Sequence, residues 1–237
     1  MNILAVDTSG PVAGVAVLSD GKIVYEGAAI NPNTHSVNLL PMVEEALTRS
    51  GLPVKAIDLF ASVVGPGSFT GVRIGVCTIK GMAHGAGKPC VGIDALEALA
   101  AGLTTENALI CPIQDARACQ VYGAAFTKGL PPKRMLGNQA MELRGFVRVA
   151  MDICKNNEKL CFVGDGVEPH RKALKEMLGE RACFLPAHLS FLRPASVAVL
   201  AETYANRAVD YYSLQPSYLR APQAERERKS KEAGNRR

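Results

Sequence analysis

Short runs of apolar residues open the chain, and their spacing predicts β-strands before any helix. The first run ends at Asp7-Thr8-Ser9-Gly10, a string of turn-forming residues. Two further apolar runs flank Asp20-Gly21, a pair that is typical of hairpin turns. We therefore expect three successive strands, over residues 3–6, 12–18 and 22–29.

The pattern then takes the period of an amphipathic helix over residues 35–50. Asn33-Thr34 can cap its start and Gly51 can end it, whereas Pro41 either bends the helix or marks its true start. Strand, helix, strand and helix are expected next over residues 57–64, 70–84, 89–93 and 95–103. A hairpin followed by crossover helices predicts a mixed sheet with helices packed on it.

The same kind of pattern starts again after residues 104–107. Strands are expected over residues 109–113, 120–127, 133–136 and 160–163, and helices over 140–153, 168–178 and 195–209. This repetition predicts a duplicated α/β fold of mixed sheets flanked by helices. Its parts would be a first lobe over residues 1–104, a shorter second lobe over 105–221, and a tail over 222–237.

Composition places the chain among globular proteins. Its 237 residues are 48% hydrophobic, which suffices for one large core or two modest ones. No uncharged apolar run reaches about 18 residues, and the start carries no basic segment, so we predict neither a membrane span nor a signal peptide and place the protein in the cytoplasm. The seven cysteines are scattered and form no CxxC pair, which favours reduced and mostly buried thiols.

Positive charge is concentrated at the C-terminus. The net charge is +5, and residues 224–237 hold six basic and three acidic residues, a net of +3. Such an end is typical of a solvated, disordered tail, although it can also contact RNA or an acidic partner. The absence of tryptophan and the 5% aromatic content argue against a base-stacking nucleic-acid module.

A glycine-rich stretch at residues 65–75 joins a predicted strand to a predicted helix. Gly65 and Gly67 can adopt positive φ, and Ser68 or Thr70 can cap the helix. The free N–H groups at such a helix start can bind an anion or a partner's loop. The stretch is not a Walker P-loop, because it lacks the lysine that this motif places on the phosphates.

The helix after this turn shows two neighbouring faces, of which one is apolar. The other consists mostly of small residues, namely Gly71, Gly75, Thr78 and Met82. Small residues four apart allow another helix to approach closely, and this helix comes either from a partner or from the same domain. Arg73 and Lys80 lie on a different face and are expected at an interface rim or in solvent.

Two loops are placed as in a nucleotide cleft between two lobes, where phosphate and adenosine loops would lie. The candidate nucleotide-binding residues are Asp7, Thr8, Ser9, Gly164, Asp165 and Gly166. Each string is also common in ordinary turns, and the strand-end acids Asp7, Asp94 and Asp115 are caps by default. The four histidines are far apart, and HExxH and GxSxG are absent, so we predict no metal site and no catalytic residue.

Five strings together resemble the bacterial TsaB (YeaZ) family, in the family's order from residue 3 to residue 220. The most specific is GPGSFTGVRIG at 65–75. The others are ILAVDTS at 3–9, HS with LLP at 35–41, DAR with VY at 115–122, and PSYLR at 216–220. The resemblance implies an ASKHA (actin/Hsp70/sugar-kinase) fold of two similar lobes.

The resemblance also implies a function. TsaB proteins are similar to TsaD, which transfers the threonylcarbamoyl group to N6 of adenosine 37 in tRNAs that read codons starting with A. TsaB is taken to be a non-catalytic scaffold that binds and activates TsaD through its first-lobe helices, together with the ATPase TsaE. The same face can form homodimers, and tRNA would be contacted only indirectly or through the basic tail.

Carried onto this chain, the resemblance places a partner interface on the helices at residues 35–50 and 70–84. The candidate interface residues are His35, Leu39, Gly67, Ser68, Phe69, Thr70, Gly71, Arg73, Gly75, Thr78 and Met82.

The chain departs from the resemblance at two sites that carry chemistry in related enzymes. TsaD-like enzymes have an HxxxH metal pair, and Ala95 and Leu99 stand at those positions here, so the metal site is lost. The second phosphate loop usually reads Asp-x-Gly but is Asp115-Ala116-Arg117 here. We expect no cofactor and at most weak ATP or ADP binding. The alternative is an active ATP-dependent ASKHA phosphotransferase that uses Asp7 and Asp115 with magnesium.

Overall fold

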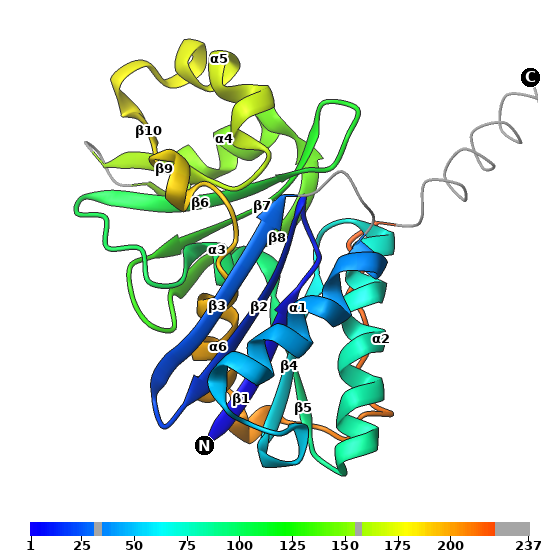
Figure 1. Ribbon diagram of the computed structural model, residues 1–237. Helices are drawn as coiled ribbons and strands as arrows, with labels where there is room; N and C mark the ends of the chain where they lie inside the picture. The colour runs from blue at the N-terminus through cyan, green and yellow to red at the C-terminus, as the bar shows by residue number, and fades with distance from the viewer. Residues whose placement is uncertain (31–34, 155–157, 221–237) are drawn as a thin grey trace, which may run out of the picture.

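The computed structural model describes residues 1–30, 35–154 and 158–220, and within these residues the chain forms two five-stranded mixed sheets (Figure 1). The first sheet has the order β3-β2-β1-β4-β5, in which β1 pairs antiparallel with β2 and parallel with β4. Its strands are β1 (Asn2–Asp7), β2 (Val12–Ser19), β3 (Lys22–Ile30), β4 (Leu59–Gly65) and β5 (Cys90–Asp94).

The second sheet repeats this arrangement in the order β10-β9-β6-β7-β8. Its strands are β6 (Ala108–Asp115), β7 (Gln120–Thr127), β8 (Lys133–Glu142), β9 (Lys159–Val163) and β10 (Ala182–Phe184). In both sheets the first strand is central, a meander lies on one side of it, and two parallel crossover strands lie on the other. The order of the strands thus shows the duplication that the sequence pattern predicted.

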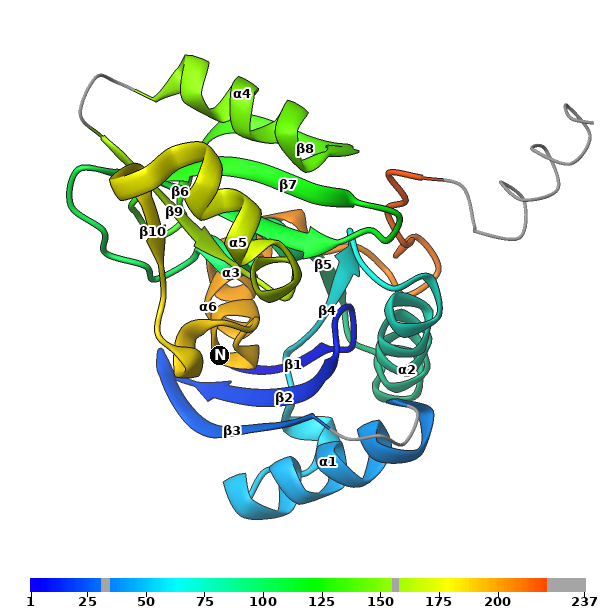
Figure 2. The same cartoon turned by 90° about the horizontal axis from the view of Figure 1, so that it is seen from above.

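Four helices cover the outer faces of the sheets, two on the first sheet (Figure 2) and two on the second (Figure 1). Helices α1 (His35–Ser50) and α2 (Phe69–Ala86) pack on the first sheet, and α4 (Leu143–Ile153) and α5 (Val167–Leu178) on the second. The described part also has four short 3-10 segments: Val54–Ala56, Gly179–Arg181, Ala187–Leu189 and Ala205–Arg207.

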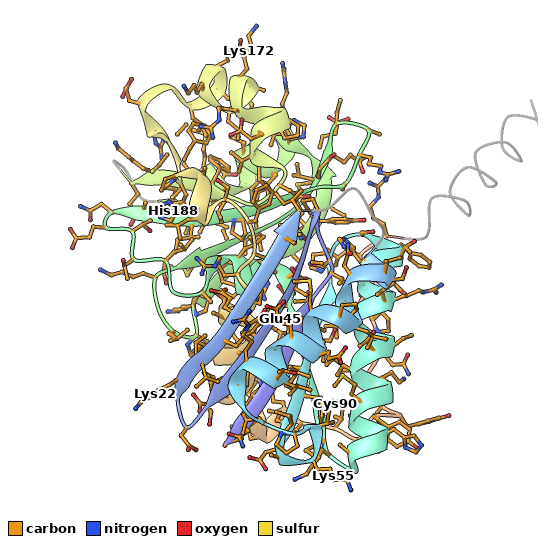
Figure 3. All side chains as sticks on the ribbon, in the orientation of Figure 1. Lys22, Glu45, Lys55, Cys90, Lys172 and His188 are labelled. Carbon is orange, nitrogen blue, oxygen red and sulfur yellow. The ribbon has the colours of Figure 1, made fainter. Side chains whose placement is uncertain are left out.

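The two remaining helices lie between the sheets and are exchanged between the lobes. Helix α3 (Ala95–Ala100) follows the first sheet but packs on β6 and β7, and α6 (Pro194–Thr203) follows the second sheet but packs on β1 and β2. A continuous apolar core joins them. Because each lobe covers a face of the other, the two lobes form one packed unit, and we call the boundary between them the seam. Figure 3 labels Lys55 in the first lobe and Lys172 in the second, at opposite ends of the molecule.

Strand β1 shows why the central strands are apolar at every position. Ile3 and Ala5 face the core between the sheets, whereas Leu4 and Val6 face the core under α1 and α2. A strand that is covered on both faces reads as a continuous apolar run. Among the helices of the described residues, none is long and apolar enough to cross a membrane.

Several predicted boundaries are wrong, and the errors at α4 and α6 have a tertiary cause. Helix α4 starts at Leu143 instead of residue 140, because residues 140–142 extend β8 along β7. Helix α6 ends at Thr203 instead of residue 209, and Val209 forms a β-bridge with Cys90. Helix α3 ends at Ala100, and the three-residue strand β10 was not predicted.

Other expectations about boundaries had different outcomes. Helix α1 starts at His35, so Pro41 lies inside it and does not mark its start. The proposed caps Asn33 and Thr34, like the tail, lie outside the described residues.

Residues 204–220, here called the C-terminal strap, run alongside α2 (Figure 1). Lys80 donates through Nζ to the carbonyl oxygens of Tyr212 and Leu214 at 3.2 and 3.0 Å. Arg73 donates through Nε to the Tyr218 hydroxyl at 2.8 Å, and its guanidinium lies 3.9 Å from the centre of the Phe69 ring. Arg73 and Lys80 thus hold the strap of their own chain, Arg73 from an exposed and Lys80 from a half-buried position, and their place at an interface rim stays a prediction.

Candidate functional site

The loop after β1 is locked to the start of α2. The Thr8 hydroxyl donates to the Gly71 carbonyl oxygen at 2.7 Å, and the Ser68 N–H donates to the Ser9 carbonyl oxygen at 2.7 Å. A Cβ on Gly71 would lie 2.0 Å from the Thr8 carbonyl oxygen, so only glycine fits there. The two motifs that stood apart in the sequence thus form one structural unit.

The glycine-rich turn has the positive φ angles that the sequence predicts for its glycines. Gly65 has a φ of +119° and Gly67 a φ of +152°. A Cβ on Gly67 would lie 2.4 Å from the Ser9 carbonyl oxygen. Of the two predicted caps, it is Ser68 whose Oγ accepts from the Gly71 N–H, at 3.2 Å. The turn therefore binds its own chain's loop instead of leaving an open cradle.

A small cavity lies between the lobes at this point. Its volume is about 10 Å³, and it brings together Asp7 and Ser9 of the first lobe with Gln114 and Asp165 of the second. Asp7, Ser9 and Asp165 are among the nucleotide-binding candidates that the sequence predicted. Gln114 is not, because a single polar residue within an apolar strand does not by itself indicate a site. The side chain of Thr8, in contrast, bonds to α2.

Burial shifts the titration of both aspartates. The pKa of Asp7 is raised to about 6 by burial, although the Ser9 N–H donates to its carboxylate at 2.8 Å and opposes the shift. The pKa of Asp165 is raised to about 6 by burial and also by the charges of Asp115 and Asp7. Two acids with pKa values near neutrality, one from each lobe, therefore line the seam.

The cavity at Asp7 and Asp165 is too small for a nucleotide. A cavity of about 10 Å³ holds one water molecule, whereas ligand pockets measure hundreds of Å³. A Cβ on Gly164 would lie 2.2 Å from the Ile113 carbonyl oxygen, and one on Gly166 3.0 Å from the Gln114 carbonyl carbon. These glycines allow the start of α5 to pack on β6, and the predicted assignment to a nucleotide loop stays a prediction without space to support it.

The second phosphate loop is a tight turn with an unusual backbone. Arg117, Ala118 and Cys119 have φ values of +62°, +51° and +58°, which side chains other than glycine rarely adopt. The Asp115 carboxylate accepts from the Arg117 N–H at 2.8 Å, and the Arg220 guanidinium donates to the Ala116 carbonyl oxygen at 3.1 Å. Asp115 thus caps a turn in this structure.

The two positions of the related metal pair lie in the core. Ala95 and Leu99 are buried in α3, and neither side chain can bind a metal. Glu97, between them, accepts from the Tyr204 hydroxyl and lies 3.6 Å from Arg134. In the part of the chain that the structure describes, no three His, Cys, Asp or Glu side chains converge as metal ligands.

The predicted interface residues divide into exposed and buried groups. Leu39 is 1% exposed and packs in the core of the first lobe, so it offers no surface to a partner. Gly71 and Gly75 face Thr8 of their own chain, which corrects their assignment to a face open to a partner helix. His35 is half-buried, with Nε2 2.9 Å from the Gly10 carbonyl oxygen.

The other predicted interface residues keep some exposure. Ser68, Thr70 and Arg73 are exposed, and Gly67, Phe69, Thr78 and Met82 are half-buried.

Sequence analysis missed an exposed apolar patch on α1. Val37 is 61% exposed and Leu40 57%, beside the exposed Pro41. Leu40 lies off the helical spacing of Leu39, Val43 and Ala46, which are the buried residues of α1. On α2 the outward side includes the exposed glycines Gly81 and Gly85. A Cβ on either one would meet no described atom within 4 Å.

The chain is similar in sequence to proteins of tRNA threonylcarbamoyladenosine biosynthesis. The family model described as "TsaD: tRNA N6-adenosine threonylcarbamoyltransferase" matches residues 27–228. The tRNA threonylcarbamoyladenosine biosynthesis protein TsaB of Bacillus subtilis is 30% identical over 95% of this chain and 96% of its own length. The TsaB of Escherichia coli is 38% identical over 54% of this chain and 56% of its own length.

Solved structures agree with the sequence relatives. YeaZ from Pseudomonas aeruginosa has a TM-score of 0.76 at 26% identity, over 92% of this chain and 99% of that one. The (R)-2-hydroxyglutaryl-CoA dehydratase component A of Acidaminococcus fermentans shares the fold alone, with a TM-score of 0.50 at 12% identity. The predicted ASKHA-type fold is thereby confirmed, and the chain belongs to the TsaB (YeaZ) family.

Proposed function

We propose that this chain is a non-catalytic cytosolic subunit that binds and activates a TsaD-type threonylcarbamoyltransferase. The reaction would be threonylcarbamoyl transfer to N6 of adenosine 37 in tRNAs that read codons starting with A. The names of the relatives support a part in tRNA threonylcarbamoyladenosine biosynthesis. A TsaE-type ATPase in the same complex, and a homodimer through the same face, belong to this proposal.

One observation carries the non-catalytic part of the proposal: the space between the lobes at Asp7 and Asp165 is nearly filled. The cavity at Asp7 and Asp165 is about 10 Å³, and the glycines after β9 lie against β6. Side chains that cannot bind a metal stand at Ala95 and Leu99. A two-lobed fold of this kind, with neither nucleotide space nor metal ligands at these positions, favours a role in binding over a role in chemistry.

The outer side of α1 and α2 supports the interface. The two helices pack against each other, and Val37 and Leu40 form an exposed apolar surface on the first turns of α1. Exposed apolar side chains that cluster on a helix are typical anchors of a protein interface. We assign the contact to Val37 and Leu40 in place of Leu39, Gly71 and Gly75.

The test is co-purification of the tagged full chain with its TsaD-type partner, followed by mass measurement of the complex. Leu40→Glu places a charge on an exposed position, so the chain should fold while the complex is lost. Met151→Glu is the matched control, because Met151 is an exposed apolar residue on α4, the counterpart of α1 in the second lobe. Equal recovery of partner with Leu40→Glu and with wild type would refute the interface.

Calorimetry with Mg-ATP on the isolated chain tests the rival phosphotransferase. We expect no binding heat at micromolar protein, because the cavity at Asp7 and Asp165 has room for about one water molecule and the side chains of Ala95 and Leu99 cannot bind a metal. Micromolar binding, with turnover that Asp7→Ala abolishes, would instead support the phosphotransferase.

A further inference from the structure

The polar wall of the interlobe cavity is incompletely bonded. Ser9 is 1% and Gln114 4% exposed, and both side chains line the cavity together with Asp7 and Asp165. Ser9 Oγ and Gln114 Oε1 have no hydrogen-bond partner among the described residues. Buried polar atoms without partners cost free energy and are uncommon. Two carboxyl groups and two unpartnered oxygen atoms therefore share a space of about one water molecule.

The aspartates come from loops on opposite sides of the seam. Asp7 ends β1 in the first lobe, and Asp165 lies two residues before α5 in the second. The loop of Asp7 is fixed to α2 through Thr8 and Ser9, and the loop of Asp165 is fixed to β6, where the Gly166 N–H donates to the Ile113 carbonyl oxygen at 3.1 Å. Neither carboxyl can move far without moving its lobe.

The charged groups around the pair act in opposite directions. His35 of α1 favours the ionised form of Asp7, and burial opposes it more strongly, so the pKa is raised to about 6. Asp115 at the end of β6 and Asp7 itself both disfavour the ionised form of Asp165, in addition to burial. The Ser9 N–H, which donates to Asp7, is a fixed donor and does not titrate.

We propose that Asp7 and Asp165 form a protonation-controlled clasp between the two lobes. With a proton on one carboxyl, that group gains an O–H donor for the oxygen-lined cavity, and the seam closes. With both carboxyls ionised, two like charges face each other in a space poor in water, and they push the loops apart. The clasp is independent of any partner protein and goes beyond the proposed function.

The direction of the pH dependence follows from the sign of the shift. Both pKa values are raised from 3.8 to about 6 in the folded chain, so the folded state holds these protons more tightly than the unfolded state. The associated stability is fully present below about pH 4 and is lost as the pH rises through about 6. Since the unfolded carboxyls are already ionised at pH 5, each group lowers the folding equilibrium constant about tenfold between pH 5 and pH 8.

Urea denaturation of the full chain at pH 5 and pH 8 tests the clasp. Asp165→Asn keeps the size of the side chain and removes its charge, so the fall in the folding equilibrium constant over this range should be about tenfold smaller than in wild type. Asp152→Asn, at an exposed aspartate of α4, should leave the fall unchanged. An identical pH dependence in wild type and Asp165→Asn would overturn the proposal.

A second measurement keeps the proposal testable if Asp165→Asn does not fold. Cys77 on α2 and Cys119 on the β6–β7 turn are both exposed and lie in different lobes, so spin labels on them report the separation of the lobes. In wild type the distance should lengthen or broaden between pH 5 and pH 8 and return when the pH is lowered. A distance that does not depend on pH would rule out the clasp. If Asp165→Asn folds, it also separates the aspartate from His35. The variant still contains His35, so a pH-dependent change in the label distance that is caused by this histidine would persist, whereas one caused by Asp165 would be lost.

Discussion

The contact between Gly71 and Thr8 allows a sharp test of how the glycine-rich turn is built. Gly71 lies in the first turn of α2, and a Cβ added there would lie 2.0 Å from the Thr8 carbonyl oxygen and 3.2 Å from Ser68 Cβ. Gly81 lies in the same helix, and a Cβ there would meet no described atom within 4 Å. Replacing either glycine with alanine is the same chemical change in two different environments.

The two substitutions should change stability in opposite directions. Alanine is favoured over glycine in a helix by about 1 kcal/mol, and Gly81→Ala should show most of that gain. In Gly71→Ala, the Thr8 carbonyl would have to retreat by about 1 Å, although the Thr8 hydroxyl and the neighbouring Ser9 carbonyl are both bonded to this turn. Such overpacking costs about 1–3 kcal/mol, and an approach of 2.0 Å to a backbone oxygen favours the upper half of that range, so we expect a net loss of about 1–2 kcal/mol after the helix gain.

Thermal unfolding followed by circular dichroism measures the difference. For a chain of this size 1 kcal/mol corresponds to about 2–4 °C, so Gly71→Ala should melt about 2–8 °C below wild type and Gly81→Ala about 2–4 °C above it. A Gly71→Ala protein that melts at or above the wild-type temperature would show that the loop after β1 yields freely and would refute the reasoning. The same geometry makes Gly75 unsuitable for an interface test, because a Cβ there would lie 2.7 Å from the Thr8 hydroxyl oxygen.

Two further changes test the ends and the cover of α2. Ser68→Ala removes the hydroxyl that accepts from the Gly71 N–H. Such a cap contributes about 1 kcal/mol, so the melting temperature should fall by about 2–4 °C, whereas Thr70→Ala should leave it unchanged. Equal effects of the two substitutions would contradict the assignment of Ser68 as the cap. Arg73→Ala removes the hydrogen bond to the Tyr218 hydroxyl and the contact with the Phe69 ring. Amide hydrogen exchange in residues 215–220 should therefore become about threefold to tenfold faster, whereas the control Tyr212→Ala should leave it unchanged. Unchanged exchange in Arg73→Ala would show that other contacts hold the strap.

The pattern of apolar residues was sufficient to predict most of the secondary structure. The bounds of α1 and β7 are as predicted, and the predicted strands of the first lobe are all present, because these segments combine a clear period with turn residues at their ends. The errors lie where tertiary contacts decide. Residues 140–142 follow β7 instead of their helical tendency, and the segment after Thr203 leaves the helix to reach Cys90 and α2.

For the candidate site, the sequence identified the motifs but not what they contact. Asp7, Ser9 and Asp165 were found because acids and small residues after strands are a local signal. Gln114 was not found, since one polar residue in an apolar strand has no local meaning until the opposite lobe faces it.

The sequence by itself determined the repeated succession of strands and helices, the glycines at positions of positive φ, and the loss of metal-binding side chains at Ala95 and Leu99. These depend on local periodicity, on backbone sterics and on the chemistry of single residues. Only the tertiary structure decided that the lobes exchange α3 and α6, that Gly71 and Gly75 face Thr8 of their own chain, and that Leu40 instead of Leu39 is exposed. Helical spacing shows that a face is small or apolar, whereas the packing of distant segments determines which surface covers it.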